Sequence, residues 1–157
     1  MHLIVTRSFP PELGGMQSLM WGLARELSKN FMIKVFADHF ENHKDFDEQA
    51  SFSIERVGGI KMLRKYRKAQ LINEFIKENK IEGIIVDHWK SLELIKSNKK
   101  KYCLIHSKEI NHPKGTSLNK RVLNVLNNVE KVIANSEFTK NLAIDCGVNQ
   151  NKIIKKI

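Results

Sequence analysis

Apolar runs and their spacing divide the chain into short strands that alternate with helices. Short apolar runs bounded by polar or glycine-containing segments predict seven strands, at residues 3–5, 31–37, 52–57, 81–86, 102–105, 132–134 and 152–157. Apolar residues at helical spacing predict helices over residues 16–27, 61–79, 92–95, 119–128 and 138–146. Residues 38–51 and 107–117 have no clear period, so we expect loops there.

This order of elements predicts an α/β fold. Strand, helix and strand in close succession form a parallel crossover unit. A chain of 157 residues is long enough for one core and too short for two ordinary domains. We therefore expect residues 1–157 to form one Rossmann-like, doubly wound domain, with a mostly parallel sheet and helices on both faces. Ligands of such sheets bind outside the carboxyl ends of the strands.

A glycine pair separates the first strand from the first helix. Pro10 and Pro11 end the strand, and Gly14 and Gly15 open the helix. Because glycine has no Cβ, the backbone can approach a phosphate there, and the free N–H groups of the first helical turn attract an anion. The alternative is a tight turn that needs glycine for its dihedral angles. The sequence contains neither a G-x-G-x-x-G nor a Walker pattern, so the motif alone does not decide between a phosphate site and a structural turn.

The net charge of +10 admits three causes: nucleic acid, an anionic membrane or phosphate ligand, or a bias toward Lys, Asn and Ile. The few aromatic residues are not interleaved with the basic ones, which argues against single-stranded nucleic acid. Basic residues surround Tyr66 in the first half of the helix predicted at 61–79. That half could lie on an anionic membrane surface, or it could be the solvated face of a helix that covers the sheet.

Other features narrow the class of protein. No apolar run approaches the ~18 residues of a membrane span, and no signal peptide precedes the first strand, so we expect a cytoplasmic protein. Cys103 and Cys146 lack a C-x-x-C spacing and are typical of a reducing compartment. His39 and His43 are four residues apart in a polar segment without an H-E-x-x-H motif, so we expect no metal site.

Five segments carry a resemblance to a known family. They are Phe-Pro-Pro-x-x-Gly-Gly at 9–15, Leu-Ala-Arg-Glu-Leu at 23–27, Val-Asp-His-Trp at 86–89, Leu-Ile-His at 104–106 and Val-Ile-Ala-Asn-Ser-Glu-x-Thr at 132–139. With them the chain resembles the amino-terminal domain of the family 4 glycosyltransferases, which are retaining enzymes of the two-domain GT-B architecture. The resemblance covers essentially the whole chain. It departs from the family at Asn30-Phe31, where Gly-His is usual, and at Ser107, where Gly is frequent.

The resemblance implies roles for individual residues. Gly14 and Gly15 would border the donor diphosphate, and His106 would be the catalytic residue at the reacting sugar. An acceptor would contact four further residues, His88, Trp89, Ser107 and Glu109. For His88 and His106 the alternative is a strand-end histidine that is hydrogen-bonded for structure.

The resemblance also implies partners. The substrates would be a nucleotide-sugar donor and a glycan, lipid-linked or small-molecule acceptor, with no metal and no covalently bound cofactor. The expected product is a cell-envelope polysaccharide or glycoconjugate. The C-terminal, donor-binding GT-B domain is absent from residues 1–157 and would act in cis or in trans. Glu74 and Glu82 have the eight-residue spacing of that domain's glutamate pair, but they lack its glycine-rich surroundings and are a coincidence. We further expect no nucleic acid, and peripheral contact with an anionic membrane on its inner face.

Two other functions stay open at this stage. A Rossmann-type oxidoreductase would use an acidic residue at the end of the second strand, and Asp38 stands there, although the glycine spacing is wrong. A basic interaction module would instead bind polyanions in a salt-sensitive way that does not depend on Gly15 or His106.

Overall fold

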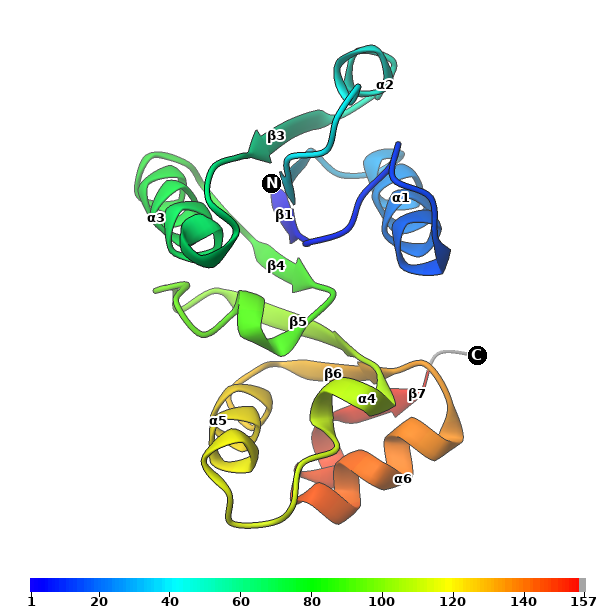
Figure 1. The fold of residues 1–157 in the computed structure, drawn as a ribbon, viewed down its shortest axis with the longest axis vertical. Coiled ribbons are helices and arrows are strands. Elements are labelled where there is room, and N and C mark those ends of the chain that lie inside the picture. The colour runs from blue at the N-terminus through cyan, green and yellow to red at the C-terminus, as the bar shows by residue number, and fades with distance from the viewer. Residues whose placement is uncertain (156–157) are drawn as a thin grey trace.

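Seven short strands form one sheet in which every neighbouring pair is parallel (Figure 1). The structure is a computed structural model, and it describes residues 1–155. The strands are β1 (His2–Val5), β2 (Ile33–Asp38), β3 (Ser53–Val57), β4 (Gly83–Val86), β5 (Lys100–Ile105), β6 (Lys131–Ala134) and β7 (Ile153–Lys155). Their order in the sheet is β3-β2-β1-β4-β5-β6-β7. The strands are rich in Ile and Val and mostly buried, as expected of a parallel sheet that has helices on its faces.

Helices connect the strands and cover both faces of the sheet. They are α1 (Gly15–Ser28), α2 (Lys44–Glu48), α3 (Lys61–Glu78), α4 (Ser107–Ile110), α5 (Ser117–Leu126) and α6 (Glu137–Cys146), with the 3₁₀ turns η1 (Trp89–Ser91) and η2 (Gln150–Lys152). In Figure 1, α1 and α3 lie on opposite sides of β1. None of the helices within residues 1–155 is long and apolar enough to span a membrane.

The core is divided between the two faces because side chains alternate along each strand. Leu3 and Val5 face one cluster, which also contains apolar residues of α3, α5 and α6. Ile4 faces the other, with Met20 and Ala24 of α1. This second face is less well covered over β4, β5 and β6, where a largely apolar hollow of about 680 Å³ lies between the sheet and α1.

The strand order reverses between β1 and β4. From β1 the chain proceeds through β2 to β3, and α3 then carries it back to β4, on the other side of β1. A reversal of this kind leaves a crevice at the carboxyl ends of the two central strands, which is where ligands of doubly wound sheets bind. The segments that border the crevice begin at Thr6 and at Asp87.

All seven predicted strands are present, and the sheet is wholly rather than mostly parallel. Three predictions of local structure were wrong. The expected loops at 38–51 and 107–117 contain the short helices α2 and α4, and the helical turn expected at 92–95 lies earlier, as η1. Two of the final strand's expected residues, 156 and 157, lie outside the described residues.

The ends of α6 follow the sequence rules. Ser136 precedes the helix, and its hydroxyl accepts the N–H of Thr139 at 3.1 Å. Gly147 follows the helix in the left-handed conformation, with φ of 106°, which a residue with a side chain adopts only at a cost. The predicted helix start and stop are therefore confirmed.

The central strands should dominate the stability of the fold. Ile105 is fully buried at the end of β5, and Ile105→Ala leaves a cavity that its neighbours fill only in part. We expect a loss of about 3 kcal/mol in the free energy of unfolding, measured by chemical denaturation. Ile60→Ala is the matched control, because Ile60 is 70% exposed and should change stability by less than about 0.5 kcal/mol. Equal losses in both variants would contradict this placement of the core.

Candidate functional site

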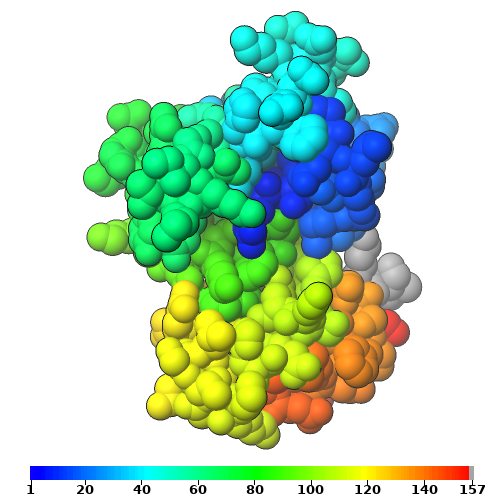
Figure 2. Space-filling model, in the orientation of Figure 1, coloured from blue at the N-terminus to red at the C-terminus, as the bar shows by residue number. Residues whose placement is uncertain are grey.

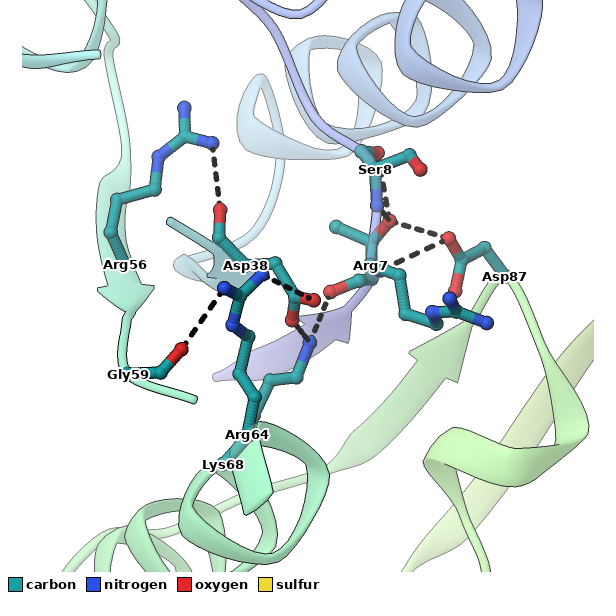
Figure 3. Close-up of polar contacts among 9 residues, drawn as sticks. Arg7, Ser8, Asp38, Arg56, Gly59, Arg64, Lys68 and Asp87 are labelled. Carbon is teal, nitrogen blue, oxygen red and sulfur yellow. Dashed lines mark hydrogen bonds and ion pairs between the residues drawn. The ribbon is translucent and has the colours of Figure 1, made fainter. Parts of the chain in front are cut away.

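The two central strands are joined at their carboxyl ends by a buried carboxyl group. Asp87 follows β4, and its Oδ2 lies 2.5 Å from the Thr6 hydroxyl and accepts the Arg7 N–H at 3.3 Å (Figure 3). Burial raises the pKa of Asp87, and the bonds from Thr6 and Arg7 oppose that rise. Its other oxygen, Oδ1, has no hydrogen-bond partner within residues 1–155. The carboxyl group thus fixes the segments on either side of the crevice relative to each other.

Glu109 on α4 contacts three polar groups, which belong to the segments after β4 and β5. Its Oε1 accepts the backbone N–H of His106 at 3.2 Å, and its Oε2 lies 3.2 Å from His88 Nε2. Its backbone carbonyl accepts the indole N–H of Trp89 at 3.0 Å. Because His88 Nδ1 accepts the Lys90 N–H at 3.1 Å, the proton of the neutral His88 ring sits on Nε2, facing Glu109.

Burial makes both members of the His88–Glu109 pair resist ionisation. It raises the pKa of Glu109 to about 8. Burial, aided by the positive charges of Arg7 and Lys90, lowers the pKa of His88 to about 4. Near neutral pH the His88 ring is therefore uncharged, and the Glu109 carboxyl titrates close to the working range of an enzyme.

His106 presents one unused ring nitrogen at the end of β5. Its Nδ1 lies 3.1 Å from the side-chain nitrogen of Asn135, which can only donate, so the proton of the neutral ring sits on Nε2. That Nε2 is buried and has no partner among the described residues. Burial lowers the pKa of His106, which keeps the ring neutral. The group is therefore a hydrogen-bond donor that stays unpaired within residues 1–155.

Gly14 and Gly15 differ in how much room the surrounding protein leaves for a side chain. Gly14 is the residue before α1, where no side chain caps the free N–H groups of the first turn. A Cβ on Gly14 would collide with the side-chain amide of Gln17. A Cβ on Gly15 would meet nothing within 4 Å. A side chain at 14 would thus force the end of the Gln17 side chain to move, whereas no neighbouring atom accounts for the glycine at 15.

Arg56 on β3 holds the loop that leads to the glycines. Its guanidinium donates to the carbonyl oxygens of Pro10 and Asp38 and makes two bonds to the Asp47 carboxylate, at 2.9 and 2.6 Å. It also lies over the ring of Phe9, 5.5 Å from the centroid. The sequence did not indicate this role. No local signal could have done so, because the Pro10 contact spans 46 residues.

Asp38 is fully engaged by cations from α3. Lys68 binds its Oδ1, and Arg64 lies 3.4 Å from its Oδ2 (Figure 3). Lys68 also donates to the Thr6 carbonyl at 2.6 Å. Burial lowers the pKa of Lys68, and Asp38 raises it. A nucleotide ribose would have to displace these partners, which argues against the oxidoreductase alternative.

The structure places most of the predicted site residues at one edge of the sheet. His88, His106 and Glu109 are connected there by hydrogen bonds, and Ser107 is half-buried at the start of α4. The glycine pair follows the neighbouring strand β1. Trp89 differs from expectation, because it is fully buried and cannot contact an acceptor directly.

His39 and His43 lie in the polar segment after β2. His43 pairs with Asp47 at 2.9 Å, and its ring contacts that of His39. Within the part of the chain that the structure describes, no three His, Cys, Asp or Glu side chains are grouped to hold a metal ion.

Comparison with known proteins gives one family and one fold. The family model of Glycosyltransferase Family 4 matches residues 13–154. Among curated proteins, a search found no match. HepE from Anabaena, solved with UDP, is similar over 98% of this chain and 43% of its own, with 18% identity and a TM-score of 0.72. A sucrose-phosphate synthase from Thermosynechococcus elongatus covers 98% of this chain and 47% of its own, with 13% identity and a TM-score of 0.74.

The fold likeness extends beyond transferases. UDP-GlcNAc 2-epimerase from Methanocaldococcus jannaschii covers 99% of this chain and 45% of its own, with 16% identity and a TM-score of 0.65. The chain therefore has a Rossmann-like fold that spans less than half the length of these three proteins. Identities this low establish the fold alone, so the choice of activity depends on the family match and the site.

The buried Glu109 should make stability depend on pH. Its pKa is near 4.5 when unfolded and about 8 when folded, so the folded chain holds an extra proton between these values and loses stability as pH rises. His88 opposes this only below about pH 6.5, where its unfolded form is charged. From pH 6.5 to 8 we expect Glu109 to contribute a fall of about 1 to 2 kcal/mol, measured by denaturation.

Glu109→Gln should remove that contribution, because an amide does not titrate. Glu48→Gln, at an exposed position on α2, is the matched control and should keep the wild-type profile. If Glu109→Gln kept the wild-type slope as well, Glu109 would not be the titrating group.

Proposed function

Because the chain belongs to glycosyltransferase family 4, we propose that it is the acceptor-side domain of a retaining glycosyltransferase. This enzyme transfers a sugar from a nucleotide-sugar donor to a glycan, lipid or small-molecule acceptor, in cell-envelope polysaccharide or glycoconjugate synthesis. One observation carries the proposal. His106 Nε2 is a buried donor without a partner within residues 1–155, and it follows a strand at the same sheet edge as the glycine pair.

The glycine pair is proposed to border the donor diphosphate. The first amides of α1 are uncapped by any side chain, and the space beside Gly15 is open. Such amides attract phosphate oxygens, and the missing Cβ permits close approach. The likeness to HepE, which was solved with UDP and with UDP-glucose, supports a nucleotide-sugar as the ligand.

His106 is proposed to act at the reacting sugar. Its neutral ring can donate from Nε2 to a sugar hydroxyl, and Asn135 fixes the ring through Nδ1. A retaining transfer depends mostly on electrostatic stabilisation of the leaving diphosphate. His106 therefore orients the sugar, while other groups stabilise the negative charge that develops on the leaving diphosphate.

The acceptor is proposed to lie beside His88, Ser107 and Glu109. The Glu109 carboxyl can bind a hydroxyl group of the acceptor, because burial keeps it largely protonated near neutral pH. The His88 ring, whose two nitrogens contact Lys90 and Glu109, holds that carboxyl in place. Trp89 then acts as a positioning residue, since its indole N–H holds the Glu109 carbonyl. No metal or covalently bound cofactor is needed for this chemistry.

A second domain is proposed to complete the site, in cis or in trans. The chain spans 43% to 47% of three structurally similar proteins, and a GT-B site lies between two domains. The described chain alone should therefore not transfer sugar. Most donor contacts and the exclusion of water would come from the second domain.

Peripheral membrane contact is a second proposal, and a specific observation favours it. At the start of α3 four apolar side chains are exposed: Ile60, Met62, Leu63 and Tyr66. Lys61, Lys65 and Arg67 are interleaved with them. Apolar and basic groups together fit an anionic lipid surface, and we place the protein in the cytoplasm at the inner face of the membrane.

Donor binding tests the proposed function directly. The chain should bind UDP-glucose weakly, on the order of millimolar, and should not turn it over with any panel of acceptors. Gly15→Val should abolish this binding by steric exclusion at unchanged melting temperature, as measured by NMR titration. Gly22→Val is the matched control, because a Cβ there also meets nothing within 4 Å. Robust turnover by the chain alone would show that the active site is misplaced.

The role of His106 is tested in the enzyme that includes the donor-binding domain. His106→Ala should lower kcat roughly 10²-fold, because the donor that orients the reacting sugar is lost. Its melting temperature should change little, since Nε2 has no partner within residues 1–155 and the Nδ1 contact with Asn135 is exposed. His39→Ala serves as control, because His39 is exposed at the end of β2. A large loss of stability with normal turnover would identify a structural histidine instead.

A further inference from the structure

A strongly basic pocket of about 340 Å³ lies at the crevice where the strand order reverses. It is formed by α3 on one side and by the segments that follow β1 and β4 on the other. Figure 2 shows α3, in green, beside a recess in which dark-blue atoms of the first residues are visible. Six cations line the pocket: Arg7, Lys61, Arg64, Lys65, Lys68 and Lys90. Among residues 1–155, Asp38 is the one acidic residue in its lining.

The cations of this pocket are not neutralised by the protein. Asp38 is shared by Lys68 and Arg64. Arg64 also donates to the Gly59 carbonyl at 3.1 Å, and its Nε is buried without a partner among the described residues. The other four cations form no ion pair within residues 1–155; they are Arg7, Lys61, Lys65 and Lys90.

Such an arrangement favours the binding of an anion, although Arg7, Lys61, Lys65 and Lys90 are also hydrated by solvent. Like charges in a concave pocket repel one another, and the low-dielectric walls strengthen their combined potential. Arg56 and Arg121, by contrast, each have a carboxylate partner, Asp47 and Glu93 respectively. Compositional bias would spread lysines over the surface, but it does not gather six of the chain's 27 basic residues around one acid.

We propose that this pocket binds a phosphate ester group carried by the acceptor. A phosphate monoester offers three oxygens and a charge of about −1.5 to −2, which suits several cations better than the single charge of a carboxylate. Arg7 and Arg64 supply planar sets of donors, and the lysines add mobile positive charges. The volume fits a phosphorylated small molecule or a headgroup and is too small for a folded partner.

The position of the pocket connects it to the proposed acceptor site, so the inference rests on the proposed function. Lys90 is two residues from His88, and its N–H is bonded to the His88 ring. Arg7 follows β1, and its N–H is bonded to Asp87, the residue before His88. The charges of Arg7 and Lys90 act on the same two groups: after burial they are the next causes of the lowered pKa of His88, and they partly oppose the burial that raises the pKa of Glu109. A phosphate held between them would place the rest of the acceptor beside His88.

The phosphate could belong to a soluble molecule or to a lipid. Met62 lines the pocket, is 82% exposed, and adjoins the exposed Ile60 and Leu63. A lipid phosphate could therefore reach the cations while the apolar side chains rest on the membrane. The phosphate chemistry is the same in both cases, so the experiment must separate the sources.

The test is a titration of the chain with sn-glycerol 3-phosphate and with glycerol, followed by amide NMR. Glycerol 3-phosphate should shift the amides of residues 5–7, 61–69 and 90–94, with a Kd on the order of millimolar, whereas glycerol should shift none. Lys65→Gln and Lys90→Gln should each weaken binding several-fold, because a charge-assisted contact is lost. Lys77→Gln is the matched control: it removes the same charge from the same helix, about 18 Å away, and should leave Kd unchanged.

A second arm uses vesicles of phosphatidylcholine with and without phosphatidic acid. Vesicle binding that requires phosphatidic acid and is competed by glycerol 3-phosphate supports the pocket with a lipid source. Binding of glycerol 3-phosphate without vesicle binding supports it with a soluble source. Binding that is the same in Lys65→Gln, Lys90→Gln and Lys77→Gln, or amide shifts elsewhere in the fold, would overturn the proposal.

The two proposals fail separately. If phosphate binds as expected but Gly15→Val leaves UDP-glucose binding intact, the proposed donor site is wrong while the pocket stands. If Gly15→Val abolishes UDP-glucose binding, but Lys65→Gln and Lys90→Gln leave the Kd for glycerol 3-phosphate unchanged, the proposed phosphate pocket is wrong while the donor site stands.

Discussion

The geometry of the site depends on the buried contact between Asp87 and the end of β1. The Thr6 hydroxyl and the Arg7 N–H both reach Asp87 Oδ2 across the point where the strand order reverses. Burying this carboxyl group costs free energy, since its pKa is raised and its Oδ1 lacks a partner in residues 1–155. The contact keeps Arg7 and His88, which follow its two members in the chain, at fixed separation.

Glu109 extends this constraint to β5. One side chain on a four-residue helix connects His88 to the backbone of His106, so the two histidines cannot move independently. The backbone carbonyl of Glu109 also accepts a hydrogen bond from the Trp89 indole N–H. Because these partners come from two segments, one after β4 and one after β5, the site depends on a tertiary contact between the ends of neighbouring strands.

The sequence predicts the sheet well because short apolar runs are a direct signature of buried parallel strands. It places the glycine pair and both histidines at one edge for the same reason. It misses α2 and α4, which are too short and too polar to show a helical period. It also misses Arg56 and the crowding of cations around Asp38, since these contacts join residues far apart in the chain. Trp89 looks like a ligand contact in the sequence, but packing under Glu109 buries it.

The site offers two different environments for anions on the two sides of β1. The first turn of α1 provides neutral backbone amides, whereas the cations gather between α3 and the segments after β1 and β4. Amides can hold a diphosphate in place, but a leaving diphosphate gains most from full positive charges. None of the six pocket cations lies on α1, so in the proposed function the charges that stabilise a leaving diphosphate would come from another part of the enzyme. The second domain proposed above would supply such charges by closing over the glycine pair, and it would leave the basic pocket free for the proposed acceptor.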